Sequence, residues 1–553
     1  MALGPDLLHR TGFERSIPPM GRPPVAGATL VVALALVCSV VVASLALGAT
    51  PTATSGLHRA SSSILILDQN GEISVRRAGR AGAAPLNRLA PIPHPRSPPR
   101  RPVGGGRPHA AAAGRRRTVR AELHRMLAAG ALSVHDYHER VTENAAARST
   151  LKRLSGTRYL ELAAVIANLD DIAARGLLIV SRVPALFETL DRNRQWWSTG
   201  PLLTDGQRVG FPASRLVWEY YPGQGIDIQW LATFGAANGL FAAHRDRELG
   251  ELLGEVVPLA SERAGGLAWE YEFRFDGGRP PWVSGLAQGT AVQALARGAQ
   301  ELRQSSFADV GRRALAVFSA PPPAGVRVAT SAGAHYLIYS FAPSERVLNG
   351  FIQALVGLHD FSSLTGDAGA RSLFTAGDAE ARLEVGHYDT GAWSLYDQST
   401  ESDLSYHELL RDFLSHLCDR LTADSTSAGT RPGPPASPSA GADEIYCATA
   451  ARFTSYLHTA PVLSLLTTTV HARTHSHIRL TVSKISVVAV TVRGPQGVTR
   501  LSYQGKLAHG THTLTWSTPR QTGSYGVDLS ATDLAGNHAQ ASATINVRGR
   551  ARP

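Results

Sequence analysis

A long series of amphipathic helices constrains the fold of this chain most. Between residues 119 and 460, apolar residues recur three and four positions apart, in segments separated by loops rich in Gly, Pro and aromatic residues. The spacing predicts a helical segment over 119–200 and further helices at 226–243, 246–263, 284–303, 306–318, 348–360, 376–386, 404–421 and 443–458. Because no fixed-period repeat is present, a bundle or a closed (α/α) barrel is favoured over a solenoid.

The pattern changes after residue 465. Residues 466–548 alternate apolar and polar positions, with turn residues about every ten positions, which is typical of an immunoglobulin-like β-sandwich. The Cys, Trp and Cys signature of antibody domains is missing, so the pattern predicts the architecture alone. We expect this sandwich to have its own core and to be dispensable for chemistry.

The formal charge of +11 would suggest a polyanionic partner if it were spread over the chain. Residues 57–120, however, hold 13 Arg against only Asp68 and Glu72, which is +11, so the remainder is neutral. The Arg/Pro/Gly-rich segment 50–118 is therefore predicted to be a disordered spacer. The charge then gives no support to a nucleic-acid function.

An uncharged run at residues 25–49 follows Arg10, Arg15 and Arg22. Its length favours a transmembrane anchor over a cleaved signal sequence, although cleavage stays open, as does a start at Met20 instead of Met1. The positive-inside bias puts residues 1–24 in the cytoplasm. We therefore expect the rest of the chain to face the outside as a membrane-anchored or secreted protein.

Cysteine usage agrees with export. Cys38 lies in the uncharged run, which leaves Cys418 and Cys447 on either side of a Gly/Pro/Ser-rich insertion. A disulfide between them and two separate buried thiols are both compatible with the sequence. No Cys or His spacing typical of a zinc site occurs, so no metal is expected.

Three segments are dense in tyrosine beside glycine and titratable residues. They are WEYYPGQGIDIQW (218–230), HYLIYSFAPSERVLNGFIQALVGLHDF (335–361) and HYDTGAWSLYDQSTESDLSYHELL (387–410). The chain has no nucleophile elbow, no phosphate-binding loop and no His-x-x-x-His zinc helix. The candidate chemistry is therefore one that tyrosines and histidines perform.

These segments resemble one family, the D-glucuronyl C5-epimerases, in their C-terminal catalytic domain. The similarity rests on YYPGQGIDIQW, PWVSGLAQG, VLNGF with GLHDF, YDTGAWSLYD and YHELL, which occur in the family's order. The resemblance implies a mainly α fold, with an (α/α) barrel or toroid at 201–462 followed by the sandwich. It also implies conversion of D-glucuronate to L-iduronate in an acidic, heparosan-like polysaccharide, without metal or cofactor.

The resemblance assigns catalysis to tyrosines. Epimerisation at C5 removes a proton beside a carboxylate and returns one to the opposite face, so it needs two acid/base groups. The matching positions are Tyr339, Tyr396 and Tyr406. Candidate substrate-binding residues are Trp282, Gln288, Asn349, Arg346, His407, Tyr221 and Gln229. Trp282 and Gln288 open the helix at 284–303, where an aromatic ring and a neutral amide suit a sugar.

Two other readings stay open. The chain departs from the family pattern at Ile338, Ser399 and Leu410, where an acidic residue, an arginine and a histidine are expected. A degenerate relative that binds acidic glycan without converting it fits these departures. A polysaccharide lyase on the same scaffold would begin with the same proton abstraction. In each case the partner is an acidic polysaccharide, and a homodimer is left open.

Overall fold

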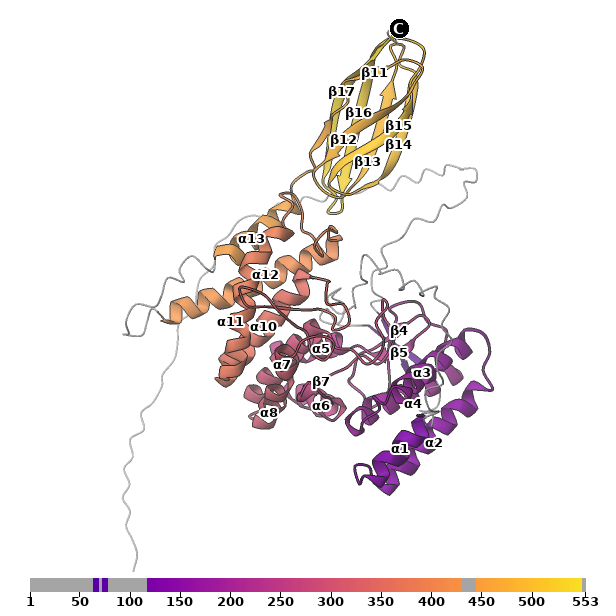
Figure 1. The fold of residues 1–553 in the computed structure, drawn as a ribbon, viewed down its shortest axis with the longest axis vertical. Coiled ribbons are helices and arrows are strands. Elements are labelled where there is room, and N and C mark those ends of the chain that lie inside the picture. Colours follow the sequence, from indigo (N-terminus) through magenta and orange to yellow (C-terminus); the bar gives the residue numbers. More distant parts are fainter. Residues whose placement is uncertain (1–62, 69–71, 78–116, 429–443, 550–553) are drawn as a thin grey trace, which may run out of the picture. The chain divides into compact units, whose positions relative to one another are not determined.

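The computed structural model describes residues 63–68, 72–77, 117–428 and 444–549 (Figure 1). All of them belong to one compact unit that begins at residue 58. The unit consists of four N-terminal helices, a small mixed β-sheet, a series of paired helices and a C-terminal β-sandwich.

Side-chain caps fix the start of several helices in the described part of the chain. Ser284 accepts a hydrogen bond from the amide of Ala287 at the start of α7, and Asp367 accepts one from Ala370 at the start of α11. The α-helices are α1 (Val119–Ala128), α2 (Val134–Leu151), α3 (Gly156–Ala174), α4 (Val183–Thr199), α5 (Trp230–Ala242), α6 (Asp246–Val256), α7 (Gly285–Glu301), α8 (Ser305–Ala314), α9 (Ala316–Ser319), α10 (Leu348–Thr365), α11 (Ala368–Glu384), α12 (Leu404–Ala428) and α13 (Glu444–Tyr456).

The strands fall into several sheets. The N-terminal sheet has the order β2-β1-β3-β4-β5, and the sandwich pairs β11-β17-β16-β13-β14 with β10-β12-β15. The strands are β1 (Ser63–Leu67), β2 (Ile73–Arg77), β3 (Arg208–Gly210), β4 (Trp218–Tyr221), β5 (Gly225–Ile228), β6 (Ser261–Arg263), β7 (Gly266–Ala268), β8 (Arg327–Ala329), β9 (Ala334–Tyr336), β10 (Leu463–Leu465), β11 (Thr469–His471), β12 (His475–Val482), β13 (Ser486–Arg493), β14 (Thr499–Leu507), β15 (Gly510–Ser517), β16 (Gly523–Asp533) and β17 (His538–Arg548).

The segment WEYYPGQGIDIQW folds as a β-hairpin in front of α5. Trp218 pairs with Ile228 across β4 and β5, and the helix begins only at Trp230. The turn depends on glycine, because Gly225 has φ +93° and a Cβ there would lie 2.5 Å from Val165. The prediction that this helix begins at residue 226 is therefore wrong: residues 225–228 form β5, and the helix begins at Trp230.

The paired helices follow the predicted segments closely. Four of them, α5, α7, α10 and α12, pack side by side in that order, and α6, α8, α11 and α13 pack against them (Figure 1). Each of the four carries an apolar or small-residue stripe on its packed faces, which is why the three-and-four spacing located them. The four helices begin near Trp230, Trp282, Asn349 and Tyr406, so their first turns carry several of the predicted site residues.

Helices α7 and α10 touch backbone to backbone through two glycines. A Cβ on Gly357 would lie 2.0 Å from the carbonyl oxygen of Gly289, and a Cβ on Gly289 would lie 2.6 Å from Cα of Ala354. Since backbone atoms cannot rotate away, this close approach needs glycine on both helices. The contact fixes the spacing between the two helices that carry Gln288 and Asn349.

We expect Gly357→Ala to lower the free energy of unfolding by about 1–3 kcal/mol, because the added methyl group must push α7 and α10 apart. Gly386→Ala is the matched control, since a Cβ at Gly386 meets nothing within 4 Å. Urea unfolding of the two variants measures the difference. Equal midpoints for Gly357→Ala and the unchanged protein would contradict this packing.

The predicted fold class, mainly α with a closed (α/α) barrel, is wrong. The helices share the described residues with five β-sheets, one of which covers the N-terminal helices. The inner helices pack in the order α5, α7, α10 and α12. The strands outside the sandwich are three to five residues long, too short to show a period of two, so the sequence pattern missed them.

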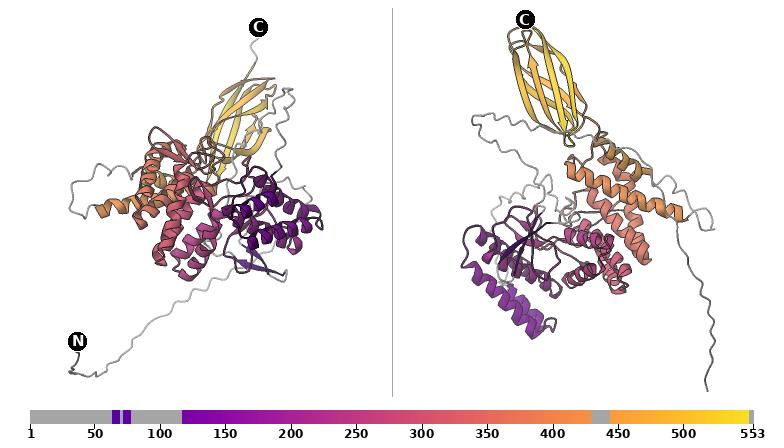
Figure 2. Two further views of the ribbon diagram at one scale, coloured as in Figure 1. Left: turned by 60° about the horizontal axis from the view of Figure 1, so that its bottom comes forward. Right: turned by 180° about the vertical axis from the view of Figure 1, so that it is seen from behind.

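The C-terminal β region is a two-sheet sandwich, as the alternation predicted. Its strands run along its length in both views of Figure 2. Inward-facing residues of both sheets form a separate core that includes Ile478, Val490, Trp516 and Tyr525. The strands β16 and β17 pair over ten residues, from Gly523↔Val547 to Thr532↔His538.

The sandwich contacts the loop that precedes α12. The carboxylate of Glu401 accepts hydrogen bonds from the amides of Ile485 at 2.9 Å and His509 at 2.6 Å. Lys484, buried and paired with Asp533 at 2.6 Å, donates to the carbonyl oxygen of Tyr456 at 2.8 Å. The loop that carries Tyr396 is thus anchored on the sandwich, and the sandwich's dispensability stays a prediction.

Cys418 and Cys447 form a disulfide in the structure. The bond joins α12 to α13, with 29 residues of sequence separation. Of the two alternatives that the sequence left open, the structure therefore contains the disulfide.

Several predictions fall on segments outside the described residues. These are the cytoplasmic segment 1–24, the anchor at 25–49 and most of the spacer 50–118. Among the helices that the structure describes, none has the length and apolarity to span a membrane. Within the predicted spacer, strands β1 and β2 pair with each other, and β1 pairs with β3. The apolar sequence SILIL forms β1, in which Leu67 is buried and Leu65 pairs with the buried Val209 of β3.

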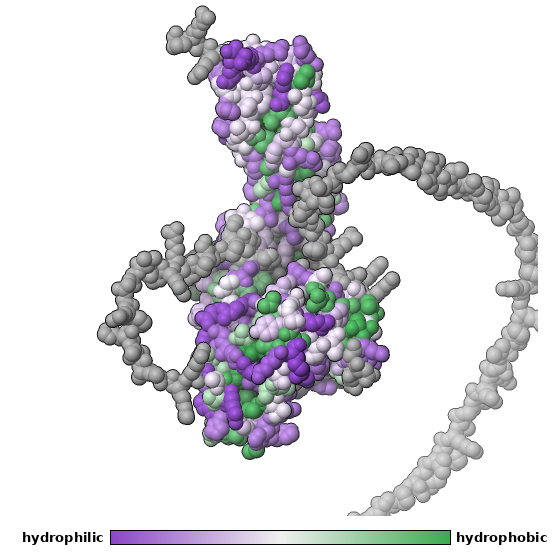
Figure 3. Space-filling view, turned by 90° about the vertical axis from the view of Figure 1, so that its right-hand side faces the viewer, coloured by the Kyte–Doolittle hydropathy of each residue, from purple (hydrophilic) through white to green (hydrophobic). Residues whose placement is uncertain are grey.

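The surface is mixed in character. On the face in Figure 3, hydrophobic residues lie in small groups among strongly hydrophilic ones. Large exposed apolar side chains such as Leu202, Leu383 and Val487 lie in a loop, in α11 and in β13, respectively. Single exposed apolar residues are usual on a surface that faces water.

Candidate active site

The three predicted catalytic tyrosines come together from three separate elements. Tyr339 lies after β9, Tyr396 lies after the short helix η5 (Val385–Tyr388), and Tyr406 lies in the first turn of α12. The ring centroids of Tyr396 and Tyr406 are 4.9 Å apart. Tyr339 interacts electrostatically with both. Tyr339 and Tyr396 are buried, whereas Tyr406 is partly exposed.

An aromatic cluster supports Tyr339. Its ring stacks on Phe341 at 5.4 Å and meets Trp282 and Phe275 at 5.6 Å each. The indole Nε1 of Trp282 donates to the carbonyl oxygen of Phe273 at 2.8 Å. Trp282 is 1% exposed, so in the ligand-free structure it packs against Tyr339 and offers little surface to a sugar. Sequence reasoning missed Phe275 and Phe341, although Phe341 follows Tyr339 by two positions.

Burial keeps two of the phenols neutral. It raises the pKa of Tyr339 and of Tyr396 well above 10, and the neighbouring tyrosines add to the shift. The Tyr396 hydroxyl has no hydrogen-bond partner among the described residues. A neutral, unpaired phenol is suited to donating a proton to a substrate.

Carboxylates lie near the tyrosine cluster. After burial and Tyr406, the negative charges of Asp397, Glu345 and Asp276 also raise the pKa of Tyr396. The family's acidic residue is replaced by Ile338 in sequence, but Asp276 and Glu345 bring acidic groups from other loops. Asp397 itself accepts hydrogen bonds from the amides of Ser399 and Thr400, at 2.8 and 2.7 Å, and so shapes the Tyr396 loop.

Gln288 and Asn349 occupy the first turns of α7 and α10, and both side chains are buried. The Nε2 of Gln288 donates to the carbonyl oxygen of Trp269 at 3.0 Å, while its Oε1 has no partner among the described residues. Val347 precedes α10 and provides no side-chain cap. The amides of the first turn of α10 therefore lack the side-chain acceptor that a helix start usually has.

Tyr221 and Gln229 serve the hairpin and the start of α5. The Nε2 of Gln229 donates to the Tyr221 hydroxyl at 2.7 Å, and its Oε1 accepts from Tyr271 at 2.8 Å and from the amide of Leu231 at 3.2 Å. Tyr221 also stacks on Phe273 at 4.6 Å. Protein atoms engage both ends of the Gln229 amide. These two predicted substrate-binding residues join the aromatic cluster indirectly, through Phe273 and Tyr271, which contact Trp282.

Arg346 lies in the loop before α10, and this loop is tied to the Tyr396 loop. The Gln398 amide donates to the carbonyl oxygen of Ser344 at 2.8 Å and accepts from the amide of Arg346 at 3.2 Å. Tyr388 donates to the carbonyl oxygen of Arg346 at 2.9 Å. These contacts join the loops that carry Arg346 and Tyr396.

His407 is held inside the protein. Its Nε2 lies 2.9 Å from the carbonyl oxygen of Phe453, its Nδ1 lies 2.8 Å from the Ser394 hydroxyl, and its ring stacks on Trp393 at 3.8 Å. The side chain is completely buried, and burial lowers its pKa to about 4. The structure therefore places His407 behind Tyr406 as a neutral anchor of α12, with both ring nitrogens engaged.

This buried imidazole predicts acid sensitivity. An unfolded histidine titrates near 6.5, and His407 near 4, so its stabilising contribution is complete above about pH 6.5 and is lost as the pH falls towards 4. The expected loss is about 3 kcal/mol over this range. His407→Gln cannot titrate, so its unfolding free energy should fall less steeply with acid. Parallel pH profiles for the two proteins would contradict the assignment.

No metal-binding cluster of three or more His, Cys, Asp or Glu occurs in the described part of the chain.

Two buried carboxyls, Asp227 and Glu272, have pKa values raised well above the usual range by burial. They lie beside the ion pair of Arg182 with Glu270, whose shortest N–O distance is 2.5 Å. Burial favours the protonated form of both groups.

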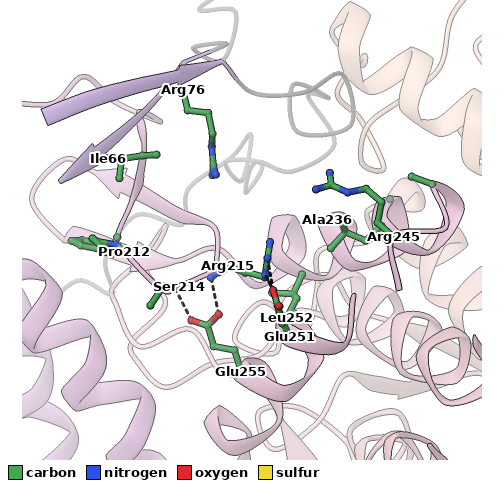
Figure 4. A pocket seen from close by; sticks show the side chains of 15 residues that line it. Ile66, Arg76, Pro212, Ser214, Arg215, Ala236, Arg245, Glu251, Leu252 and Glu255 are labelled. Atoms are coloured by element: carbon green, nitrogen blue, oxygen red, sulfur yellow. Dashed lines mark hydrogen bonds and ion pairs between the residues drawn. The ribbon is translucent and has the colours of Figure 1, made fainter. Parts of the chain in front are cut away.

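A cavity of about 750 Å³ lies between β1–β2 and helices α5 and α6 (Figure 4). Its carboxylates are already engaged: Glu255 accepts from the Ser214 hydroxyl at 2.6 Å, and Glu251 pairs with Arg215. None of the predicted site residues lines it. The cavity therefore lacks the acid/base groups that the tyrosine cluster provides.

Comparison with known proteins agrees with the motifs. Residues 264–427 match the family described as "D-glucuronyl C5-epimerase C-terminus". A D-glucuronyl C5-epimerase of Caenorhabditis elegans is 29% identical over 131 residues, 21% of each chain. An uncharacterized protein of Methanocaldococcus jannaschii is 27% identical over 138 residues, 24% of this chain and 45% of the other.

The matched segment contains all three tyrosines, which lie at 339, 396 and 406. Over this segment the chain is similar to the C-terminal region of the D-glucuronyl C5-epimerases, and the predicted resemblance is confirmed. The matches span about a fifth of the worm enzyme and less than half of the archaeal protein.

Proposed function

We propose that this protein is a uronate C5-epimerase that converts glucuronate to iduronate residues in an acidic polysaccharide. The observation that carries the proposal is the meeting of Tyr339, Tyr396 and Tyr406 within the family-matched segment. They belong to three loops and helix starts, and nothing in their local sequence requires them to meet. A proton-transfer site would explain why three tyrosines from separate elements lie together.

The proposed chemistry is two proton transfers. One group takes the proton from C5 as the C–H bond breaks, and the electron pair moves into the substrate carboxylate. Tyr406, the most exposed of the three, is the proposed base in its phenolate form, and neutral Tyr396 is the proposed acid that gives its hydroxyl proton to C5 from the opposite face. Tyr406 then carries the proton taken from C5 and Tyr396 is ionised, so exchange of protons with water restores the starting state. The uncapped amides at the start of α10 would stabilise the charge that develops on the carboxylate.

Substrate access requires movement, because Tyr339 and Tyr396 are buried in this ligand-free structure. The two loops linked by Gln398, Ser344 and Arg346 are the proposed cover. The Tyr388 hydroxyl also holds these loops together, through the carbonyl oxygen of Arg346, so their separation would break this bond as well. A polysaccharide would enter where these loops part.

A glycan-binding protein without activity is the second candidate. After burial, the groups that raise the Tyr396 pKa most are a tyrosine and three acidic residues. The family's arginine is replaced by Ser399, which bonds to Asp397. A site without a nearby cation holds a substrate carboxylate less firmly and gives little help to an ionised phenol.

Incubation of heparosan with the protein in heavy water separates the candidates. An epimerase incorporates deuterium at C5 and produces iduronate, both of which nuclear magnetic resonance detects. An unsaturated, ultraviolet-absorbing product would instead identify a lyase. Absence of deuterium from heparosan and other glucuronate-containing polysaccharides, with binding retained, would favour the glycan-binding protein.

A further inference from the structure

A second cavity lies among the four inner helices, away from the cavity of Figure 4. It has a volume of about 290 Å³ and is lined by residues of α5, α7, α10 and α12. Its polar lining consists of neutral amides and a hydroxyl, the imidazole of His416 and the guanidinium groups of Arg297 and Arg420. The lining contains no carboxylate. A site of this composition suits an anion that also carries hydroxyl groups.

The two arginines are held in place from behind by Asp360. One carboxylate oxygen accepts from Arg297 at 2.9 Å, from Arg420 at 2.8 Å and from Gln293 at 2.8 Å. Asp360 does not itself line the cavity. It therefore fixes the direction of both guanidinium groups. Because one carboxylate pairs with two guanidinium groups, the three side chains together carry a net positive charge.

Both guanidinium groups keep donors to spare. Arg297 donates to Asp360 and to the side chain of Asn238, and Arg420 donates to Asp360 and to the carbonyl oxygen of His416. A guanidinium has five N–H donors, so each group has at least two that these described partners do not use. Such donors are suited to a bidentate contact with a carboxylate.

The cavity continues the helix faces that carry the site residues. On α10, Asn349, Gln353 and Val356 recur at intervals of four and three. On α12, Tyr406, Phe413 and Arg420 recur at intervals of seven. Residues with this spacing lie on one face of a helix. At ~1.5 Å per residue, Phe413 lies about 10 Å along the axis from Tyr406, a separation that an oligosaccharide can span.

We propose that this cavity is a subsite for a second acidic sugar residue of the same chain, about two sugar residues from the reacting one. The sugar carboxylate would pair with Arg297 and Arg420, the amides of Gln293 and Gln353 would bond its hydroxyls, and Phe413 would contact the ring. Its place within a polysaccharide rests on the proposed function. Binding of the acidic sugar itself does not, because it needs no proton transfer.

Titration of the full chain with D-glucuronate tests the subsite, with saturation-transfer nuclear magnetic resonance as the readout and D-glucose as the uncharged control. We expect glucuronate to bind at least 10-fold more tightly than glucose. Arg420→Gln should weaken glucuronate binding at least 10-fold. Gln353→Leu, which leaves the contacts of Asp360 with Arg297 and Arg420 in place, should weaken it as well. Arg312→Gln on the surface should leave it unchanged.

Tyr406→Phe distinguishes this subsite from the tyrosine cluster. Glucuronate binding that survives Tyr406→Phe and is lost in Arg420→Gln supports the subsite, even if no deuterium exchange is ever found. Equal affinity for glucose and glucuronate would overturn it. So would binding that is unchanged in both Arg420→Gln and Gln353→Leu, or binding lost only in Tyr406→Phe.

Discussion

Replacing Tyr396 by phenylalanine is expected to lower the rate of iduronate formation at least 100-fold without weakening the fold. The proposed role of Tyr396 is to return the proton, which phenylalanine cannot do. Its hydroxyl is buried and has no hydrogen-bond partner among the described residues. Its removal therefore breaks no described bond, and the free energy of unfolding should stay unchanged or rise by up to about 1 kcal/mol.

Tyr406→Phe should reduce iduronate formation as strongly, and the isotope pattern should separate the two roles. Without the base, C5 keeps its proton, so no deuterium enters glucuronate. Without the acid, the base can still remove and return a proton on one face, so deuterium can enter without inversion. Nuclear magnetic resonance of heparosan recovered from heavy water measures both quantities.

Tyr446→Phe is the matched control. Its hydroxyl, on α13, donates to the Asp378 carboxylate of α11 at 2.7 Å, and neither residue belongs to the loops of the proposed site. This variant should lose about 1.5–3 kcal/mol of stability and keep its activity. If Tyr396→Phe is stable but inactive while Tyr446→Phe is less stable but active, the loss of activity cannot be a consequence of reduced stability. Full activity in both Tyr396→Phe and Tyr406→Phe would remove the tyrosines from the mechanism.

The sequence predicted the inner helices well because their signal is local. The predicted helix at 284–303 became α7 (Gly285–Glu301), and 404–421 became the start of α12 (Leu404–Ala428). Each has enough turns to repeat its apolar stripe several times. The alternation at 466–548 located the sandwich for the same reason.

The short strands were beyond that reasoning. Strand β3 has three residues, Arg208–Gly210, and exists because it pairs with β1, more than a hundred positions earlier. Pairing over such a distance is decided by tertiary contacts, which a local pattern does not contain. The prediction of a mainly α fold failed at these strands, and not at the helices.

The site was predicted unevenly for a similar reason. The family motifs placed Tyr339, Tyr396 and Tyr406, and the structure brings them together. The motifs could not show which side of its helix His407 faces, and its ring turns inward to Trp393 and Phe453. Nor could they find Asp276 and Glu345, which reach Tyr396 from separate loops.

Asp360 gives the second large expected effect, on stability. Its side chain is 10% exposed and forms ion pairs with Arg297 and Arg420. Asp360→Asn would leave two half-buried guanidinium groups without their shared negative charge. Since breaking a buried ion pair from one side costs about 3–5 kcal/mol, we expect a loss of that size at pH 7. Asp309→Asn, at an ion pair whose Asp309 is 65% exposed, should cost at most about 1 kcal/mol.

The pH dependence of this loss identifies its cause. Burial acts to raise the pKa of Asp360, but hydrogen bonds from Arg420 and His359 outweigh it and hold the pKa well below its usual range. An unfolded aspartate titrates near 3.9, so the contribution of Asp360 is complete above about pH 4 and is lost as the pH falls below that value. Against the effect of burial, Asp360 also helps to raise the pKa of His359, so the gap between the wild type and Asp360→Asn should widen as His359 gains its proton between pH 7 and about pH 5, and narrow below pH 4. Urea unfolding at each pH measures it, and a gap that keeps its full size at the lowest pH would mean that Asp360 stabilises the helices by packing and not by its charge.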